Sequence, residues 1–148
     1  MKAQPDMPLK ILLVDDEQEF VQTLAERLQM RDMDSKAVYD GPAALAQVQS
    51  DPPQILIVDL KMPEMDGIDV LKQVKQTHPS IQVIVLTGHG SEQDKKTCMD
   101  LGALAYFQKP VDIDQLGDAI KQGRENIRQH ASPATIPDRY PDTGAWQP

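Results

Sequence analysis

Cysteine and histidine are scarce in this sequence of 148 residues, which has one cysteine and three histidines. Cys98 therefore has no partner within the chain for a disulfide. The chain also lacks the CxxC and HxxxH spacings typical of zinc sites, which excludes a zinc site built from Cys98 and the histidines. A lone cysteine is most often a small buried apolar residue, and we expect Cys98 to be one.

Basic residues and long apolar runs are also scarce. The chain has 15 Lys and Arg against 23 Asp and Glu, which gives a net charge of -8. This charge repels DNA and anionic membranes, so we expect no direct binding of nucleic acid. No apolar run approaches the roughly 20 residues of a membrane span, and the N-terminal sequence MKAQPDMPLK lacks the apolar region of a signal peptide. These absences predict a cytoplasmic protein that does not insert into a membrane.

The chain does contain a regular alternation of short apolar runs and segments with helical spacing. Apolar residues make up 40% of the chain, which is enough for the core of one domain. The expected strands are 11–14, 35–40, 55–58, 81–86 and 103–107. The expected helices lie around 20–28, 42–48 and 68–75, from 91 onward, and around 116–127. Pro42 suits a first helical turn, and Ser91 with Asp94 resembles a capping box.

Strands that alternate with helices predict a parallel sheet, because each connection has to cross over one face of it. We therefore expect an α/β fold, with an open, doubly wound sheet of five parallel strands and helices on both faces. Residues 1–8 are expected to be an N-terminal extension, and residues 9–129 the domain. Residues 130–148 are rich in proline, have no helical period and are predicted to be a flexible tail. The chain is either a domain that works alone or part of a larger protein.

Acidic, hydroxyl and basic side chains stand at the ends of four of the expected strands. Asp15 and Asp16 follow the first, Asp59 follows the third, Thr87 ends the fourth and Lys109 follows the fifth. Ligands of open parallel sheets bind at the carboxyl ends of the strands, so we expect these side chains at one edge. Two carboxylates roughly 4 Å apart repel by about 4 kcal/mol at an effective dielectric of 20, and a cation has to offset this. Oxygen ligands favour Mg²⁺, and a carboxylate beside Mg²⁺ and an ammonium is equipped to accept a phosphoryl group.

Four short motifs together resemble the receiver domain of two-component response regulators, of the type found in chemotaxis regulators. They are DD at 15–16, DLKMPEMDG at 59–67, TG at 87–88 and KP at 109–110. The similarity runs from Leu9 to Arg128, and the order and spacing of the motifs are specific where each motif alone would be weak. The resemblance implies a flavodoxin-like fold with strand order 2-1-3-4-5 and five helices. It also implies a function in phosphorelay signal transduction.

The resemblance assigns the chemistry to the acidic residues. Asp59 would be the phosphoacceptor, which takes a phosphoryl group from a sensor histidine kinase or a histidine phosphotransfer protein. Mg²⁺ would be the cofactor, held by Asp15, Asp16, Asp59 and the backbone carbonyl of Lys61. The protein would then be no enzyme in the usual sense, because it would catalyse only its own phosphorylation and dephosphorylation.

The resemblance also implies a switch. Thr87 would hydrogen-bond a phosphoryl oxygen, Lys109 would pair with the phosphoryl group, and Tyr106 would turn inward as Thr87 moves. The peptide bond between Lys109 and Pro110 is expected to be cis. The helix from Ser91 has few apolar residues and should be weakly held. Its face, together with the fifth strand and last helix, would contact a downstream protein, and dimer formation is a further option for output.

Several alternatives stay open at this point. Asp16 and Asp66 could be helix N-caps, and Tyr106 could be an edge-strand tyrosine with its hydroxyl in water. The whole chain could be a receiver-like binding module that phosphorylation does not regulate. A phosphatase of the haloacid dehalogenase type would need Asp-x-Asp where the chain has Asp-Asp-Glu, and an FMN binder would need a Ser/Thr/Gly-rich loop where DDEQEF stands.

Overall fold

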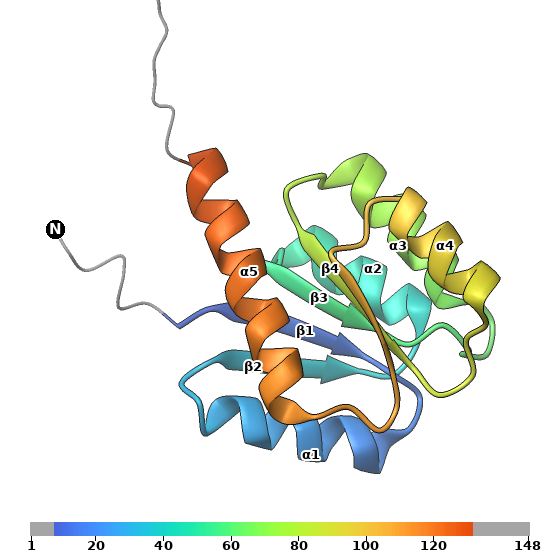
Figure 1. The fold of residues 1–148 in the computed structure, drawn as a ribbon, viewed down its shortest axis with the longest axis horizontal. Coiled ribbons are helices and arrows are strands. Elements are labelled where there is room, and N and C mark those ends of the chain that lie inside the picture. Colours follow the sequence, from blue (N-terminus) through green and yellow to red (C-terminus); the bar gives the residue numbers. More distant parts are fainter. Residues whose placement is uncertain (1–7, 132–148) are drawn as a thin grey trace, which may run out of the picture.

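The computed structural model of the protein describes residues 8–131, so nearly all of the expected extension and tail lies outside the described residues. Strands and helices alternate along this part of the chain, as the sequence predicts (Figure 1). The strands are β1 (Lys10–Val14), β2 (Asp34–Val38), β3 (Ile55–Val58), β4 (Gln82–Thr87) and β5 (Ala105–Gln108). The helices are α1 (Gln18–Gln29), α2 (Gly41–Ser50), α3 (Gly67–Thr77), α4 (Glu92–Asp100) and α5 (Ile113–Ala131).

Within residues 8–131, the strands form one parallel sheet of five strands in the order β2-β1-β3-β4-β5. This confirms the predicted α/β fold and its strand order. The arrowheads of β1, β2 and β3 point in the same direction in Figure 1, so their carboxyl ends share one edge of the sheet. At β1 the order reverses, because β2 lies on one side of it and β3 on the other. Such a reversal opens a crevice at the carboxyl ends of the central strands.

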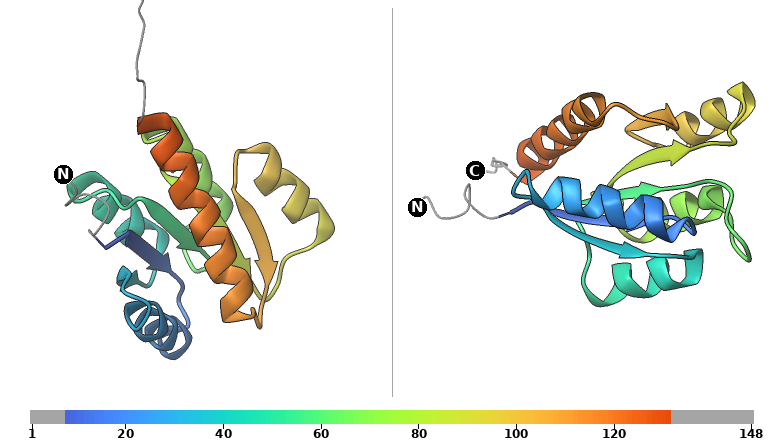
Figure 2. Two further views of the ribbon diagram at one scale, coloured as in Figure 1. Left: turned by 60° about the vertical axis from the view of Figure 1, so that its left-hand side comes forward. Right: turned by 90° about the horizontal axis from the view of Figure 1, so that it is seen from below.

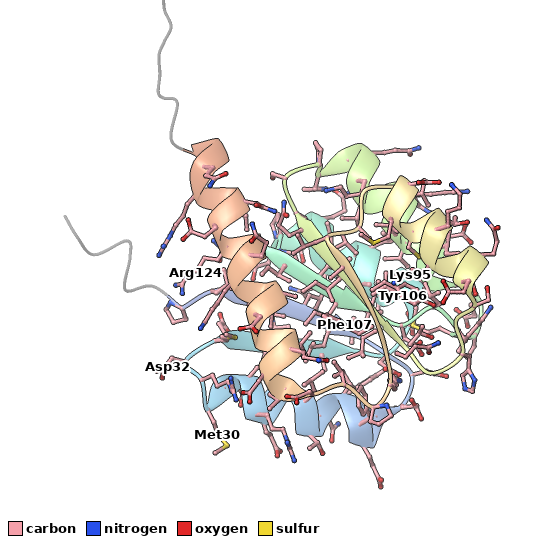
Figure 3. All side chains as sticks on the ribbon, in the orientation of Figure 1. Met30, Asp32, Lys95, Tyr106, Phe107 and Arg124 are labelled. Atoms are coloured by element: carbon pink, nitrogen blue, oxygen red, sulfur yellow. The ribbon has the colours of Figure 1, made fainter. Side chains whose placement is uncertain are left out.

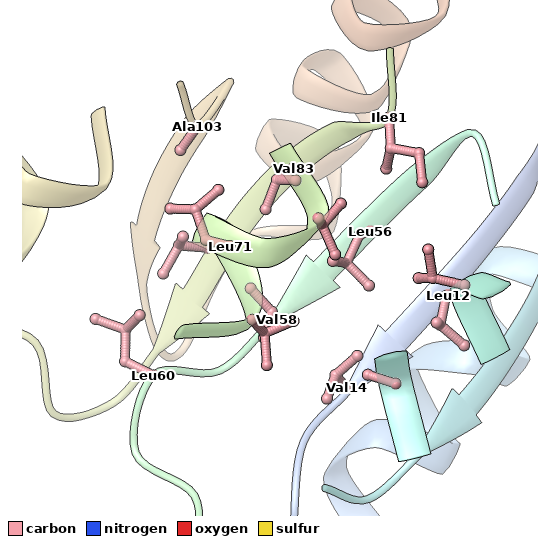
Figure 4. Packing of buried hydrophobic residues seen from close by; sticks show 14 of the residues in the cluster. Leu12, Val14, Leu56, Val58, Leu60, Leu71, Ile81, Val83 and Ala103 are labelled. Carbon is pink, nitrogen blue, oxygen red and sulfur yellow. The ribbon is translucent and has the colours of Figure 1, made fainter. Parts of the chain in front are cut away.

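The three central strands β1, β3 and β4 are buried on both faces, which explains their continuous apolar sequences, whereas the edge strands β2 and β5 are partly exposed. Alternate strand residues pack on opposite faces: Leu12 and Leu56 belong to one cluster, and Ile11 and Ile55 to the other. Residues of α2, α3 and α4 complete the first cluster, in which Leu71 of α3 meets side chains of the central strands (Figure 4). Residues of α1 and α5 complete the second, and Figure 2 shows the resulting layers from two further sides.

Helix caps explain where several elements begin. The Asp40 side chain accepts a hydrogen bond from the Ala43 N–H and caps α2, which is why β2 ends at Val38 and does not reach residue 40 as predicted. Asp66 caps α3 in the same way. Ser91 and Asp94 form the predicted capping box of α4. The N-cap of α1 is Glu17, so the interpretation of Asp16 as a helix cap is wrong.

Helix α4 is held by few buried side chains. Among its residues in the structure, Cys98 is the one that is buried, whereas Met99 is 41% exposed. The burial of Cys98 is as predicted and raises the pKa of its thiol to about 11, with the charges of Asp94 and Asp66 adding to the effect. Among residues 8–131, no helix combines the length and the apolar character that crossing a membrane requires.

Candidate functional site

Strand pairing brings the acidic residues together at the carboxyl edge of the sheet. Val14 of β1 is the register partner of Val58 of β3, so Asp15 and Asp59 leave the two strands at the same level. The Asp59 N–H donates to the Val14 carbonyl oxygen over 2.9 Å, which continues the ladder by one residue. Asp16 completes a group of three carboxylates whose candidate ligand oxygens all lie within 4.8 Å of one another. Asp15 and Asp59 are buried, and Asp16 is exposed.

The same pairing carries the hydroxyl and ammonium groups to this edge. Thr87 pairs with Gln108, and the next residue, Lys109, donates its backbone N–H to the Thr87 carbonyl oxygen over 2.9 Å. Thr87 is fully buried, and its hydroxyl oxygen accepts a hydrogen bond from the His89 N–H over 3.3 Å. The Lys109–Pro110 peptide bond is cis, as the resemblance implies.

The Lys109 ammonium lies among three carboxylates. Its Nζ is 2.7 Å from Asp15 Oδ2, 2.5 Å from Glu17 Oε1 and 4.0 Å from Asp59 Oδ2. Burial alone would lower the Lys109 pKa, but the hydrogen bonds to Asp15 and Glu17 outweigh it, and the pKa is raised. The ammonium also lies over the ring of Phe20 of α1, with Nζ 4.4 Å from the ring centroid. Lys109 is therefore a fixed positive charge at the edge of the acidic cluster.

The two buried carboxylates are held differently. Asp15 accepts from the Glu17 N–H through Oδ1 and from Lys109 through Oδ2. Desolvation still outweighs these contacts, so the pKa of Asp15 is raised. The Oδ1 atom of Asp59 is buried and has no hydrogen-bond partner among the described residues. Buried polar atoms are usually hydrogen-bonded, so this oxygen is available to a ligand that the protein itself does not supply.

The donor set fits a magnesium ion. Mg²⁺ prefers oxygen ligands and binds through one or two carboxylates while it keeps several waters. Asp15, Asp16 and Asp59 offer three carboxylates at one point, and the unpaired Asp59 Oδ1 is available for coordination or for reaction. Lys61 follows Asp59 by two residues, and its ammonium is 4.0 Å from Asp94 on α4. Its backbone carbonyl as a ligand stays a prediction.

Tyr106 lies on the α4 side of β5, and the next residue, Phe107, lies on the α5 side (Figure 3). The Tyr106 hydroxyl oxygen is buried, without a partner among the described residues. It fills the space beside Gly90, where an added Cβ would overlap it and come within 2.9 Å of the Thr87 methyl group. The interpretation of Tyr106 as an edge tyrosine with its hydroxyl in water is therefore wrong. In a Gly90→Ala variant, the methyl group would therefore overlap the Tyr106 hydroxyl.

Two residues of the site were missed in the sequence, Glu17 and Phe20. Both touch Lys109 across more than 85 positions of the chain, and spacing alone does not indicate such a contact. The available signal was the third consecutive acid in LLVDDE. An acid that follows a pair of candidate metal ligands indicates that a basic side chain lies nearby.

Comparison with known proteins agrees with this geometry. The family model of the response regulator receiver domain matches residues 11–121. The chain belongs to the response regulator receiver domain family. Receiver domains act as regulators in two-component systems, bind Mg²⁺ through an acidic pocket and interact with histidine kinases or phosphotransfer proteins. In this receiver domain, Asp15, Asp16 and Asp59 form an acidic cluster at the carboxyl edge of the sheet.

Individual relatives of the receiver domain differ in length. Sporulation initiation phosphotransferase F of Bacillus subtilis (strain 168) is 36% identical over 113 residues, which are 76% of this chain and 91% of that protein. The transcriptional regulatory protein CpxR of Klebsiella pneumoniae is 42% identical over 112 residues, 76% of this chain but 47% of CpxR. The chain thus spans about half of CpxR. A response regulator receiver domain protein from Clostridium thermocellum has a structure with a TM-score of 0.76 and 30% identity, covering 83% of this chain and 97% of that one.

Proposed function

We propose that this receiver domain accepts a phosphoryl group on Asp59 in an Mg²⁺-dependent reaction, with a histidine kinase or a histidine phosphotransfer protein as the donor. The observation that carries the proposal is the convergence of three carboxylates within 4.8 Å, next to the Lys109 ammonium. In the proposed reaction an Asp59 oxygen bonds to phosphorus while the bond from phosphorus to the donor's imidazole nitrogen breaks. The protein catalyses only this transfer and the later hydrolysis of its own acyl phosphate.

The residues of the chain divide the work. Asp59 Oδ1 is the nucleophile we favour, since it has no hydrogen-bond partner among the described residues. The Lys109 ammonium and the Thr87 hydroxyl donate hydrogen bonds to the phosphoryl oxygens as negative charge develops on these oxygens. Bound Mg²⁺ would be held by Asp15, Asp16, Asp59 and the Lys61 carbonyl, and would supply charge neutralisation for the carboxylates and the phosphoryl oxygens.

Intact-mass spectrometry after incubation with acetyl phosphate tests the proposal. We expect one phosphoryl group on the parent with Mg²⁺, none after removal of Mg²⁺ by a chelator, and none on Asp59→Asn. Asp69→Asn, which changes an exposed aspartate of α3, is the matched control and should be phosphorylated like the parent. A parent that gains no phosphoryl group under any condition would make the protein a phosphorylation-independent binding module. Phosphorylation of Asp59→Asn would place the acceptor elsewhere.

Addition of Mg²⁺ is expected to stabilise the folded protein. An ion that binds only the native state at 100 times its Kd raises the free energy of unfolding by about 2.7 kcal/mol. The gain should disappear in Asp16→Asn, which removes an exposed member of the cluster, and should persist in Asp69→Asn. Urea unfolding with and without Mg²⁺ measures it, and an equal gain in Asp16→Asn would remove that residue from the metal site.

The phosphoryl donor has a partly apolar groove available beside the proposed reaction centre. The groove has a volume of about 430 Å³ and lies between α1 and the start of α5. Phe20, Leu24, Val111 and Ile113 form its apolar part, and Phe20 also touches Lys109. The polar part of the lining consists of Glu19, Thr23 and Arg27. A donor protein has to bring its histidine to Asp59 over this edge of the sheet. We propose that it docks through this groove.

Ile113→Glu is expected to slow phosphotransfer from a donor protein at least tenfold, because it places a charge in the apolar part of the proposed contact. Phosphorylation by acetyl phosphate, which needs no docking surface, should stay within twofold of the parent. Met30→Glu places the same charge on a side chain that is 84% exposed at the end of α1 and serves as the control. Equal losses with both phosphodonors would show damage to the reaction centre and no role in docking.

Output is proposed to pass through the face of α4, β5 and α5 to a downstream protein, with dimerisation as one form of that contact. Two features support this assignment. α4 has few buried side chains in the described structure, and Tyr106 packs against the same cluster as Cys98 of α4 while its hydroxyl lies with the Thr87 methyl group beside Gly90. The net charge of -8 argues against direct binding of nucleic acid. We place the protein in the cytoplasm, where a histidine kinase presents its phosphoryl group.

A further inference from the structure

Glu17 occupies the N-cap position of α1 but does not cap the helix. A side chain at this position ordinarily accepts a hydrogen bond from an N–H of the first helical turn. Among the described residues, the Glu17 carboxylate makes no such bond. It is turned instead to Lys109, which lies 92 positions away, with Oε1 2.5 Å from Nζ. The pKa of Glu17 is lowered chiefly by this hydrogen bond.

The partners of Lys109 differ in how free they are to move. The side chains of Lys109 and Asp15 are 12% and 5% exposed, whereas that of Glu17 is 63% exposed. Asp15 is also fixed by the Glu17 N–H, so its carboxylate cannot turn away without losing a second bond. The carboxylate of Glu17 is therefore the partner that can leave into solvent. Asp59, at 4.0 Å, is the carboxylate that the ammonium does not yet hydrogen-bond.

We propose that Glu17 is a positioning residue that holds the Lys109 ammonium in the unphosphorylated protein and gives it up to an incoming phosphoryl group. The inference rests on the proposed function of the site. Glu17 belongs neither to the three-carboxylate cluster nor to the groups that touch the reacting atoms. It acts through Lys109, as an anion that competes with the phosphoryl oxygens for one cation.

Removal of the Glu17 charge has two effects, and both raise the rate of phosphorylation at Asp59. The ammonium loses a competing partner, and the approach to Asp59 loses a negative charge that repels an anionic phosphodonor. Because Glu17 is mostly exposed, water and salt screen its charge, and the effect is modest. We expect Glu17→Gln to be phosphorylated by acetyl phosphate about two- to fivefold faster than the parent at low donor concentration.

The first test uses the metal-free protein and no reaction at Asp59. Reductive methylation with formaldehyde and cyanoborohydride labels lysines at rates that depend on the freedom of each amine, and peptide mass spectrometry assigns the rates. Lys109 should react about two- to fivefold faster in Glu17→Gln than in the parent. Glu26→Gln removes one charge from an exposed position of α1 away from the site and should leave the Lys109 rate unchanged. Urea unfolding of each variant checks that the fold is intact.

The second test compares initial phosphorylation rates of the parent, Glu17→Gln and Glu26→Gln at several acetyl phosphate concentrations with Mg²⁺. A higher rate for Glu17→Gln alone, together with faster labelling of Lys109, supports the role. Equal Lys109 labelling in the parent and Glu17→Gln, or a phosphorylation rate in Glu17→Gln no higher than in the parent, overturns it. A parent that takes up no phosphoryl group overturns the proposed function itself, and with it the role of Glu17.

Discussion

Replacement of Gly67 by alanine is expected to lower the free energy of unfolding by about 3 kcal/mol or more. A Cβ at this position would overlap the backbone carbonyl oxygen of Asp59 and lie 2.9 Å from both its carbonyl carbon and the Leu60 Cα. Backbone atoms cannot rotate away as a flexible side chain can. The first residue of α3 or the end of β3 would therefore have to move. Either movement displaces the proposed phosphoacceptor, so phosphorylation should fall together with stability.

Gly117 provides the matched control. It lies inside α5, where the nearest atom to an added Cβ is the end of the Arg31 side chain at 3.4 Å. Alanine is favoured over glycine in a helix interior, so Gly117→Ala should stabilise the protein by up to about 1 kcal/mol. Urea unfolding of the two variants should show shifts of opposite sign. A Gly67→Ala protein as stable as the parent would mean that the loop after β3 adapts easily, and that Gly67 is not needed for close packing.

The fold could be predicted because its signals are local. Apolar runs such as Ile55–Val58 identify buried strands, and the alternation of these strands with helices predicts a parallel sheet. The boundaries were less well predicted because apolar character reports burial and not strand pairing. The fifth strand was expected from residue 103 and begins at Ala105, although Ala103 is buried. The fourth was expected from residue 81 and begins at Gln82, although Ile81 is buried.

The sequence predicts which side chains meet at the carboxyl edge of the sheet as far as the strand ends determine it. Asp15, Asp59, Thr87 and Lys109 each follow or end a strand, so the topology alone carries them to one edge. Contacts made by a flexible side chain do not follow from topology. At the start of α1, the Glu17 side chain could cap its own helix or contact another element, and the sequence is compatible with both. Only the three-dimensional structure distinguishes them.

Lys109→Met is expected to change two properties of the site in opposite directions. The variant keeps an unbranched side chain beside Phe20 but removes the positive charge next to Asp15, Glu17 and Asp59. Loss of a charged group that stabilises the transition state typically slows a reaction by about 100-fold to 1000-fold. Phosphorylation by acetyl phosphate should fall by about this factor. Mg²⁺ should bind about tenfold more tightly, because one cation no longer repels another at the same carboxylates.

Opposite signs make this prediction specific. General damage to the acidic cluster would weaken Mg²⁺ binding and slow phosphorylation. Loss of a cation that competes with Mg²⁺ and assists the reaction would instead strengthen Mg²⁺ binding and slow phosphorylation. Lys10→Met is the control, since Lys10 pairs with Asp51 at the amino end of β1, away from the site. Mg²⁺ titration followed by urea unfolding measures binding, and intact-mass kinetics measure phosphorylation. Weaker Mg²⁺ binding in Lys109→Met would show that the ammonium organises the carboxylates for the metal, and the view of Lys109 as a competing charge would be wrong.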